Sequence, residues 1–488
     1  MPTLRDVRRR FRVGLCELLV PAARGARPLL VVIVLAGTSD LIAQTNPSDP
    51  GPHPQHAGSP QNMPPGMRGS RNIHVLSHIP LGGFVRVTDI EIEQEMSRPF
   101  AYVGKRWQPS GFDVISLEDP EDAAVIYSWR IENAELHQGW GSSDGRYFKL
   151  NGRYYYVQGT SYRQGGPDSD LGAIVFDVTG LPDVSTVEEV GRIRSPDGIP
   201  SGFHNIFMYK HSDGRALLFA TTRSPRNVPY GVVIYDMEHF LAGDPNFGLV
   251  GSVPLPEPRG TADGYHDIYV GYHPASGQDR FYGPGPEVTM DGGMYVYDVS
   301  DVANPRLLTQ IVGAMGQTGA HTFVPTPDGR FAFSMTLGEK PMLVWDLKPG
   351  LDGPVQNITR PIGSWTSTWP NTLHNFEVRW PYVFIAGYEE SLQVVNVMDP
   401  TNPYSTGYYY TYSGPHESRG PGGVSNGAWG VDVRNSDGLI VISDGTTGFW
   451  AFKMDGFEGW NGDDWGVPDV SSAQDWDNGP VGERRPVS

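Results

Sequence analysis

The sequence has 488 residues, a formal net charge of −18 and a single cysteine. This acidic balance, without a basic stripe, makes nucleic acid and anionic membrane surfaces unsuitable partners. Because the only cysteine, Cys16, lies near the N-terminus, the remaining sequence excludes an internal disulfide, a thiolate metal site, an iron–sulfur cluster and the attachment of c-type haem.

Residues 1–44 have the pattern of an export signal. An arginine-rich start at 8–12 is followed by the apolar run 28–37, and small residues near Ala43 favour cleavage there. An apolar run of about 10 residues is too short for the roughly 20 that a membrane-spanning helix needs, so we expect no stable transmembrane segment in the mature chain. The signal predicts a periplasmic or extracellular protein. Arg8-Arg9-x-Phe11 also resembles a twin-arginine signal, and the choice between that route and the general secretory one stays open.

Residues 45–71 are rich in Pro, Gly, Ser and Gln, which predicts a flexible spacer. The first 44 residues carry seven arginines and three acidic residues, so the rest of the chain has a net charge near −22. This acidity suits solubility or the attraction of cations.

Beyond the spacer, one β-branched and aromatic run recurs seven times, opening on a small residue or Pro in each copy. The copies occupy residues 111–119, 172–180, 231–239, 293–301, 341–349, 391–399 and 448–456. A strand-like run precedes each copy and a further one follows most of them, with apolar and polar residues alternating. Units of this length with four short strands are typical of β-propellers. We therefore predict an all-β, seven-bladed β-propeller of four-stranded blades over residues 72–460.

The seventh unit lacks an outer strand, whereas residues 72–81 offer a spare one. We expect this N-terminal strand to close the ring, which would remove the free sheet edges. Residues 461–488 contain few apolar positions after Trp465 and are predicted to form a C-terminal surface tail.

The strand-plus-turn phrases MYVYDVSDVANP (294–305) and LQVVNVMDPTNP (392–403) resemble those of bacterial LVIVD-repeat propellers. The resemblance covers nearly the whole chain after the spacer. It implies a propeller fold and an exported or surface protein. It implies no particular activity, because the molecular function of that family is mostly unassigned.

Four histidines recur at one position of the repeat, separated by 62, 55 and 53 residues: His204, His266, His321 and His374. The first strand of a propeller blade lines the central channel, so these imidazoles would form an arc around the axis and share a metal. At the matching position the other units have Thr88, Ser143 and Trp429, which would leave one side of the arc open. Nitrogen ligands favour iron, copper or zinc.

Six residues near these histidines are candidates to orient the imidazole rings by accepting their second N–H. They are Asn205, Asp267, Thr322, Asn375, Glu377 and Asp432. One hypothesis for this chain is therefore a metal-dependent oxidoreductase that acts on a small-molecule substrate.

The alternative is a non-catalytic scaffold that binds a protein or a cell-surface polymer. In WD-type propellers an equivalent histidine bonds an aspartate of its own blade and holds the strands together. Asp236, Asp298 and Asp346 follow three of the four histidines in the same units. The sequence leaves both interpretations open.

Overall fold

The computed structural model describes residues 68–480. Within this range it leaves out residues 83–85, 107–108, 163–167, 197–201, 223–229, 257–263, 286–291, 315–318, 337–340, 368–372, 413–425 and 470–473. The predicted export signal and almost all of the predicted spacer lie outside the described residues.

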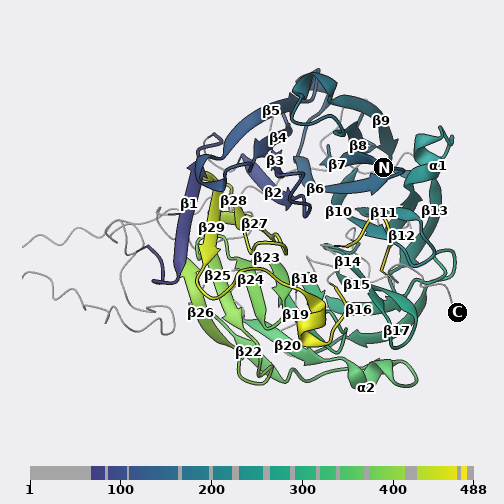
Figure 1. The fold of residues 1–488 in the computed structure, drawn as a ribbon. Coiled ribbons are helices and arrows are strands. Elements are labelled where there is room, and N and C mark those ends of the chain that lie inside the picture. Colours follow the sequence, from purple (N-terminus) through teal and green to yellow (C-terminus); the bar gives the residue numbers. More distant parts are fainter. Residues whose placement is uncertain are drawn as a thin grey trace, which may run out of the picture. The chain divides into compact units, whose positions relative to one another are not determined.

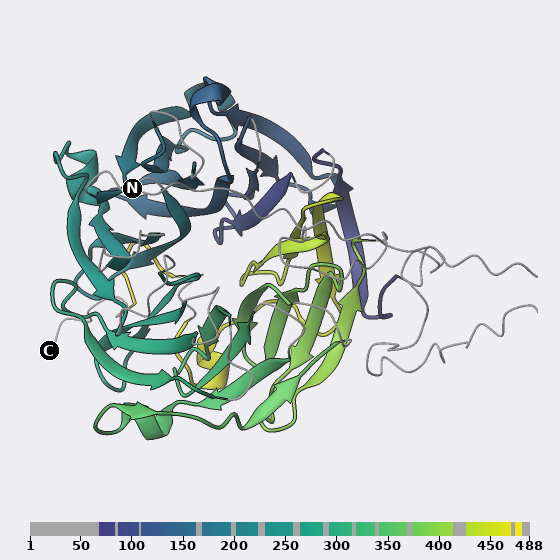
Figure 2. The same ribbon diagram turned by 180° about the vertical axis from the view of Figure 1, so that it is seen from behind.

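Seven sheets form a ring (Figures 1 and 2), each with four antiparallel strands ordered from the centre outwards; one sheet has a short parallel fifth strand in addition. Blade 1 contains β2 (Val87–Ile92), β3 (Phe100–Lys105), β4 (Gly111–Ser116) and β5 (Ala124–Arg130). Blade 2 contains β6 (Gly141–Leu150), β7 (Arg153–Ser161), β8 (Leu171–Asp177) and β9 (Glu188–Arg194). Blade 3 contains β10 (Phe203–Lys210), β11 (Ala216–Thr222), β12 (Tyr230–Asp236) and β13 (Leu249–Pro254).

The remaining blades repeat this order. Blade 4 contains β14 (Tyr269–His273), β15 (Gln278–Gly285), β16 (Gly293–Asp298) and β17 (Arg306–Ile311), with β21 (Gln356–Asn357) as a short fifth strand. Blade 5 contains β18 (Ala320–Pro325), β19 (Phe331–Thr336), β20 (Met342–Asp346) and β22 (Gly363–Trp365). Blade 6 contains β23 (Asn375–Arg379), β24 (Tyr382–Ala386), β25 (Leu392–Asn396) and β26 (Tyr404–Tyr409). Blade 7 contains β27 (Ala428–Val433), β28 (Ile440–Asp444), β29 (Gly448–Met454) and β1 (Ile73–Ile79). The prediction of a seven-bladed β-propeller is confirmed.

The ring is closed by the N-terminal strand. β1 pairs antiparallel with β29, from Ile73 opposite Met454 to Ile79 opposite Phe449. Figure 1 shows β1 on the outside of blade 7, next to the C-terminal strands and far from them in sequence. The predicted closure is confirmed, and it gives blade 7 the outer strand that its own repeat lacks.

The core lies between the faces of successive blades. The third strands of blades 3 to 5 (β12, β16 and β20) supply Ile234, Val296 and Val344 to one continuous cluster of buried side chains. Alternation at period two explains this packing, because every second residue of a strand faces the same neighbouring blade. Two short helices, α1 (Met237–Leu241) and α2 (Lys348–Leu351), follow third strands. In the described part of the chain, no helix is long and apolar enough to cross a membrane.

Innermost strands of five blades carry a β-bulge close to their first residues. The register shifts between Val87 and Ile90, Ser142 and Gly145, Phe203 and Ile206, Ala320 and Thr322, and Ala428 and Gly430. A bulge sets two residues against one on the partner strand and redirects their side chains. His204 and His321 lie in such bulges, so both a histidine and the apolar residue two positions on can be buried on different sides of the chain.

Part of the predicted C-terminal surface tail contacts the ring. The side chain of Gln474 donates to the Met208 carbonyl at 2.9 Å and accepts from the Lys210 amide. Trp476 packs on Phe148, with 6.2 Å between ring centroids. These contacts tie the segment to blades 2 and 3.

Candidate functional site

The structure brings the four repeated histidines together, although they come from four blades. The ring centroids of successive histidines lie 4.6 Å apart for His204 and His266, 3.7 Å for His266 and His321, and 4.6 Å for His321 and His374. All four side chains are buried. Since each blade places its histidine at or just before the innermost strand, the imidazoles form a contiguous arc at one end of the channel.

Hydrogen bonds fix the tautomers of two of these rings. The Thr322 hydroxyl has one proton, which it donates to the His374 carbonyl at 2.9 Å, so it accepts from Nδ1–H of His321 at 2.9 Å. Nδ1 of His374 lies 2.6 Å from the carbonyl oxygen of Trp429, which can only accept. In a neutral imidazole a protonated Nδ1 leaves the lone pair on Nε2. His321 and His374 thus present Nε2 as a potential metal ligand.

His204 and His266 meet through their Nε2 atoms, which lie 3.0 Å apart. One of these nitrogens donates and the other accepts. This distance is that of an ordinary N–H···N hydrogen bond. Two nitrogen ligands on a tetrahedral metal, each about 2.1 Å from it, would lie about 3.4 Å apart.

The arrangement is not yet that of a loaded metal centre. Among the residues that the structure describes, no three His, Cys, Asp or Glu side chains form a group that could hold a metal ion as they stand. The His266 and His321 rings lie 3.7 Å apart and only 32° from parallel, so their nitrogens do not point at a common centre. The tautomers of His321 and His374 fit a metal, whereas one Nε2 of the His204–His266 pair carries the proton of their hydrogen bond. Binding of one ion by all four residues would require that proton to leave and either the His266 ring or the His321 ring to rotate.

Aromatic rings from the other blades complete the circle. Trp140 lies 6.0 Å from His204 and 6.2 Å from Trp429, and Trp429 lies 4.7 Å from His374, all between ring centroids. The guanidinium of Arg106 stacks on Trp140 at 3.1 Å and lies 4.9 Å from the centre of the Trp429 ring. The side of the arc that the sequence leaves open is thus lined by two indoles and a cation. Trp140 and Arg106 fall outside the repeat position, so the periodicity did not identify them.

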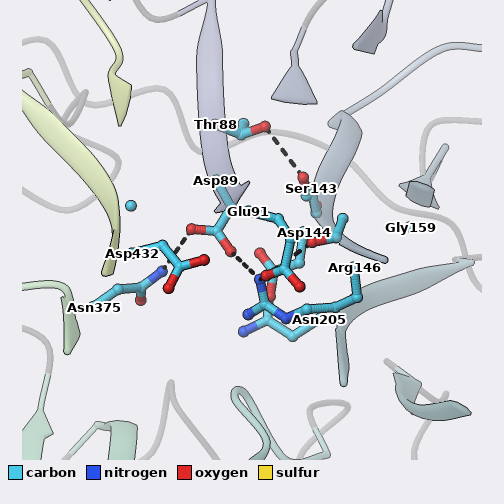
Figure 3. A network of polar contacts seen from close by, with 12 residues as sticks. Thr88, Asp89, Glu91, Ser143, Asp144, Arg146, Gly159, Asn205, Asn375 and Asp432 are labelled. Carbon is cyan, nitrogen blue, oxygen red and sulfur yellow. Dashed lines mark hydrogen bonds and ion pairs between the residues drawn. The ribbon is translucent and has the colours of Figure 1, made fainter. Parts of the chain in front are cut away.

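Beyond the histidine position, the innermost strands carry acidic side chains into the channel. Figure 3 shows Asp89, Glu91 and Asp144 gathered around Arg146, whose Nη1 lies 3.2 Å from Asp89 and 3.1 Å from Glu91. Burial would lower the pKa of Arg146, but attraction to Glu91, Asp89 and Asp144 raises it well above its ordinary value. Burial raises the pKa of all three carboxyl groups, and in Asp144 the charge of Asp89 adds to the effect. The channel is an ionic network here and not an apolar pore.

Five of the six predicted orienting residues lie in or beside this network. Asn205 donates to Asp267 at 3.2 Å and Asn375 donates to Asp89 at 3.4 Å. Asp432 accepts from the Ile92 amide at 2.8 Å, and Glu377 accepts from Arg379 at 2.6 Å. The described bonds that orient His321 and His374 come from Thr322, which was also predicted, and from the Trp429 carbonyl, which was not.

Burial also raises the pKa of two of these acids into the neutral range. The pKa of Asp267 is raised to about 6 by burial. The pKa of Asp432 is raised to about 7 by burial and by the charge of Glu377. Carboxyl groups with such values exchange protons near neutral pH.

The aspartates that a WD-type arrangement would pair with the histidines lie elsewhere. Asp236 accepts from the amide of Glu238, Asp298 from that of Ser300 and Asp346 from that of Lys348, so all three cap the turns after third strands. A different histidine links blades: His211 lies 3.3 Å from buried Asp279 of blade 4. The described hydrogen bonds of these three aspartates therefore go to the turns of their own blades and not to the axial histidines.

The fold and the channel define this chain as a seven-bladed β-propeller protein with a histidine arc at one end of its axis. No protein-family model matches the sequence, and no curated protein matches it. Among solved structures it is similar to Raptor from Chaetomium thermophilum, with a TM-score of 0.49 and 10% sequence identity. That similarity covers 79% of this chain and 30% of the Raptor chain.

Proposed function

We propose that this chain is an exported metalloprotein in which His204, His266, His321 and His374 hold one transition metal. The observation that carries the proposal is the pair of fixed tautomers: backbone and hydroxyl oxygens take up Nδ1–H of His321 and His374, which leaves Nε2 as the ligand atom. Metal-ligating histidines in proteins have such a second hydrogen bond on the nitrogen that does not bind the metal.

The all-nitrogen donor set favours iron, copper or zinc, and bound iron or copper would supply oxidation–reduction chemistry. On this basis the proposed activity is that of a metal-dependent oxidoreductase acting on a small molecule. The chain's own residues would bind and orient that substrate within the circle of imidazoles and indoles. The predicted export signal supports a periplasmic or extracellular site of action, and the repeat phrases support membership of the LVIVD-repeat propellers.

The proposal is tested by elemental mass spectrometry of the full chain, purified without a histidine tag from its native export route. We expect about one iron, copper or zinc per chain, as four ligands around one ion require. His321→Ala should remove the metal, because the His321 imidazole lies in the middle of the arc. The propeller should stay folded.

His273→Ala is the matched control, since His273 is also buried but bonds the Tyr282 hydroxyl within blade 4 at 2.9 Å. That variant should keep its metal even where it loses stability.

The second candidate is a non-catalytic scaffold for a protein or a surface polymer. It is favoured by the continuous circle of contacts from Trp140 through the four histidines to Trp429, which would stabilise the ring without any metal. Protein that stays metal-free after reconstitution with iron, copper and zinc, and in which His321→Ala lowers stability alone, would establish this alternative and exclude the metalloprotein.

A further inference from the structure

The segment between blades 1 and 2 carries Trp140 to the axial circle. It follows Asn133 and contains a short 3₁₀ helix, η3 (Ala134–Leu136). Two glycines flank the tryptophan, Gly139 with φ = 124° and Gly141 with φ = 84°. Residues with a side chain rarely adopt such values, and glycine lets the backbone pivot at both positions. The position of the indole therefore depends on how the rest of the segment is held.

His137 holds this segment from inside. It is only 1% exposed, and its Nδ1 lies 2.8 Å from the Glu132 carbonyl oxygen and 3.0 Å from that of Asn133. Its Nε2 lies 3.0 Å from Oδ2 of Asp168, in the segment before β8. Carbonyl and carboxylate oxygens only accept hydrogen bonds, so both ring nitrogens donate and the ring is an imidazolium.

Asp168 is the anion of this pair. Arg194 of β9 donates to its other carboxylate oxygen at 2.7 Å, and this bond lowers the pKa of Asp168 although burial acts to raise it. Within the described residues, charged and titratable groups surround His137 from its own segment and from three others. They are Glu132; Tyr162 of β7, whose ring centroid lies 5.0 Å from that of His137; Asp168 and Asp170 before β8; and Arg192 and Arg194 of β9, which pair with Glu132 and with the two aspartates.

We propose that His137 is a positioning residue of the axial site, which as an imidazolium holds Trp140 beside the histidine arc and releases it when a proton leaves. Whichever nitrogen loses its proton, a lone pair then faces an oxygen acceptor and a buried hydrogen bond is lost. Histidine is the side chain that ordinarily changes its charge between pH 5 and 8. The segment should therefore be held at the acidic end of this range and freed at the alkaline end.

Release of the segment would change the axial circle. Trp140 lies 6.0 Å from His204 and 6.2 Å from Trp429 between ring centroids, and Arg106 stacks on it at 3.1 Å. Without the bonds of His137, the indole would be held by these contacts alone and could turn about its two glycines. The side of the circle without imidazoles would then open. This device involves no metal, so it operates whether or not the axial histidines hold one.

The test follows the fluorescence of Trp140 in the full chain from pH 5 to 8, as the difference between each protein and the same protein carrying Trp140→Phe. In the wild type we expect this difference to change with pH as the indole is freed. His137→Gln should abolish that change, because an amide does not titrate. Asp168→Asn should shift the change to lower pH by about one unit, because an imidazolium without its anion loses the proton more readily.

His74→Gln is the matched control, since it breaks another histidine–aspartate pair, with Asp455 at 2.8 Å, on the outer strand of blade 7. It should keep the wild-type profile. A change caused by titration of His204, which also lies near Trp140, would persist in His137→Gln.

Three results would contradict the inference. They are a Trp140 signal that is constant from pH 5 to 8 in the wild type, a change that persists undiminished in His137→Gln, and an unshifted change in Asp168→Asn. The first and third need no His137 variant, so the test remains decisive if His137→Gln does not fold.

Discussion

Blades 3 to 6 and blades 7, 1 and 2 place different chemistry at the same positions around one axis. The first group contributes an imidazole where each innermost strand begins. Three residues further on, only blade 6 of this group has a carboxylate, that of Glu377. The second group begins with Trp429, Thr88 and Ser143, and three residues further on carries Asp432, Glu91 and Arg146. The two arcs share a backbone and differ in side chains.

This difference separates ligand chemistry from fold stability. In the histidine arc, oxygen acceptors hold two of the rings, His321 and His374, and the other two bond each other. The ionic arc consists of buried charges that stabilise the fold only while they are paired. Variants of the two arcs should therefore change different measured quantities.

The largest effect is expected in the ionic arc. Arg146→Met leaves Asp89 and Glu91 buried without their cation, which should lower the free energy of unfolding by about 3–5 kcal/mol. Denaturant titration measures this loss. The exposed Arg306, which pairs with Asp298 at 2.9 Å, is the control, and its replacement by Met should cost less than about 1 kcal/mol. Equal midpoints for the two variants would show that the ionic arc adds no stability.

A smaller effect should appear in the pH dependence of stability. Because the pKa of Asp432 is about 7 in the folded chain and about 3.8 when unfolded, the folded state binds more protons between these values. Stability should therefore fall as pH rises from about 4 to 7. Glu377 raises this pKa and Arg379 lowers it, so both face the group.

Asp432→Asn should reduce that fall in stability by about 2 kcal/mol. The whole pKa shift, at about 1.4 kcal/mol per pKa unit, would give more, but neighbouring carboxyl groups share the proton. Asp399→Asn is the control: Asp399 is exposed, bonding to Thr401 lowers its pKa, and its contribution is lost only at lower pH. Unchanged stability curves for Asp432→Asn between pH 4 and 7 would contradict the prediction.

The smallest change in stability is expected in the histidine arc. Thr322→Val removes the hydroxyl between His321 and the His374 carbonyl, which should cost about 1 kcal/mol of stability. It should also weaken metal binding roughly 10- to 100-fold, because the tautomer of His321 is no longer fixed. Competition with a chelator measures this affinity.

Thr309→Val is the matched control for the arc. Its hydroxyl is equally buried and donates to the Gln356 carbonyl at 2.9 Å, far out in blade 4. Both variants should lose similar stability, and only Thr322→Val should lose metal affinity. Equal metal affinity in the two would reduce the axial hydrogen bonds to a structural role.

The repeat made the fold predictable. All seven β-branched runs are third strands, and the runs before them are second strands, because a strand buried on both faces needs the same residue types in every blade. The spare strand at 72–81 was identified by what the seventh unit lacked. The short helices after Asp236 and Leu347 were not predicted, since they follow from local turn geometry and not from the repeat. The fifth strand of blade 4 was not predicted either, because it depends on a long-range parallel pairing of Gln356 with Thr309.

The histidines were predictable as a set and not as an arrangement. Their spacing indicated one imidazole per blade, yet a flat strand would have sent them between blades as readily as to the axis. His204 and His321 lie in β-bulges, at Phe203–Ile206 and Ala320–Thr322, whereas His266 and His374 lie just before innermost strands that pair in regular register. A bulge depends on the partner strand, which a single sequence does not show.

The sequence by itself determined the number of blades, the closing strand and the identity of the four histidines, because a repeat imposes the same hydrophobic pattern on each unit. Only the tertiary structure decided that Thr322 and the Trp429 carbonyl orient two of the rings and that Arg106 lies between Trp140 and Trp429. These contacts join residues of different blades, and their geometry depends on how the blades pack around the axis.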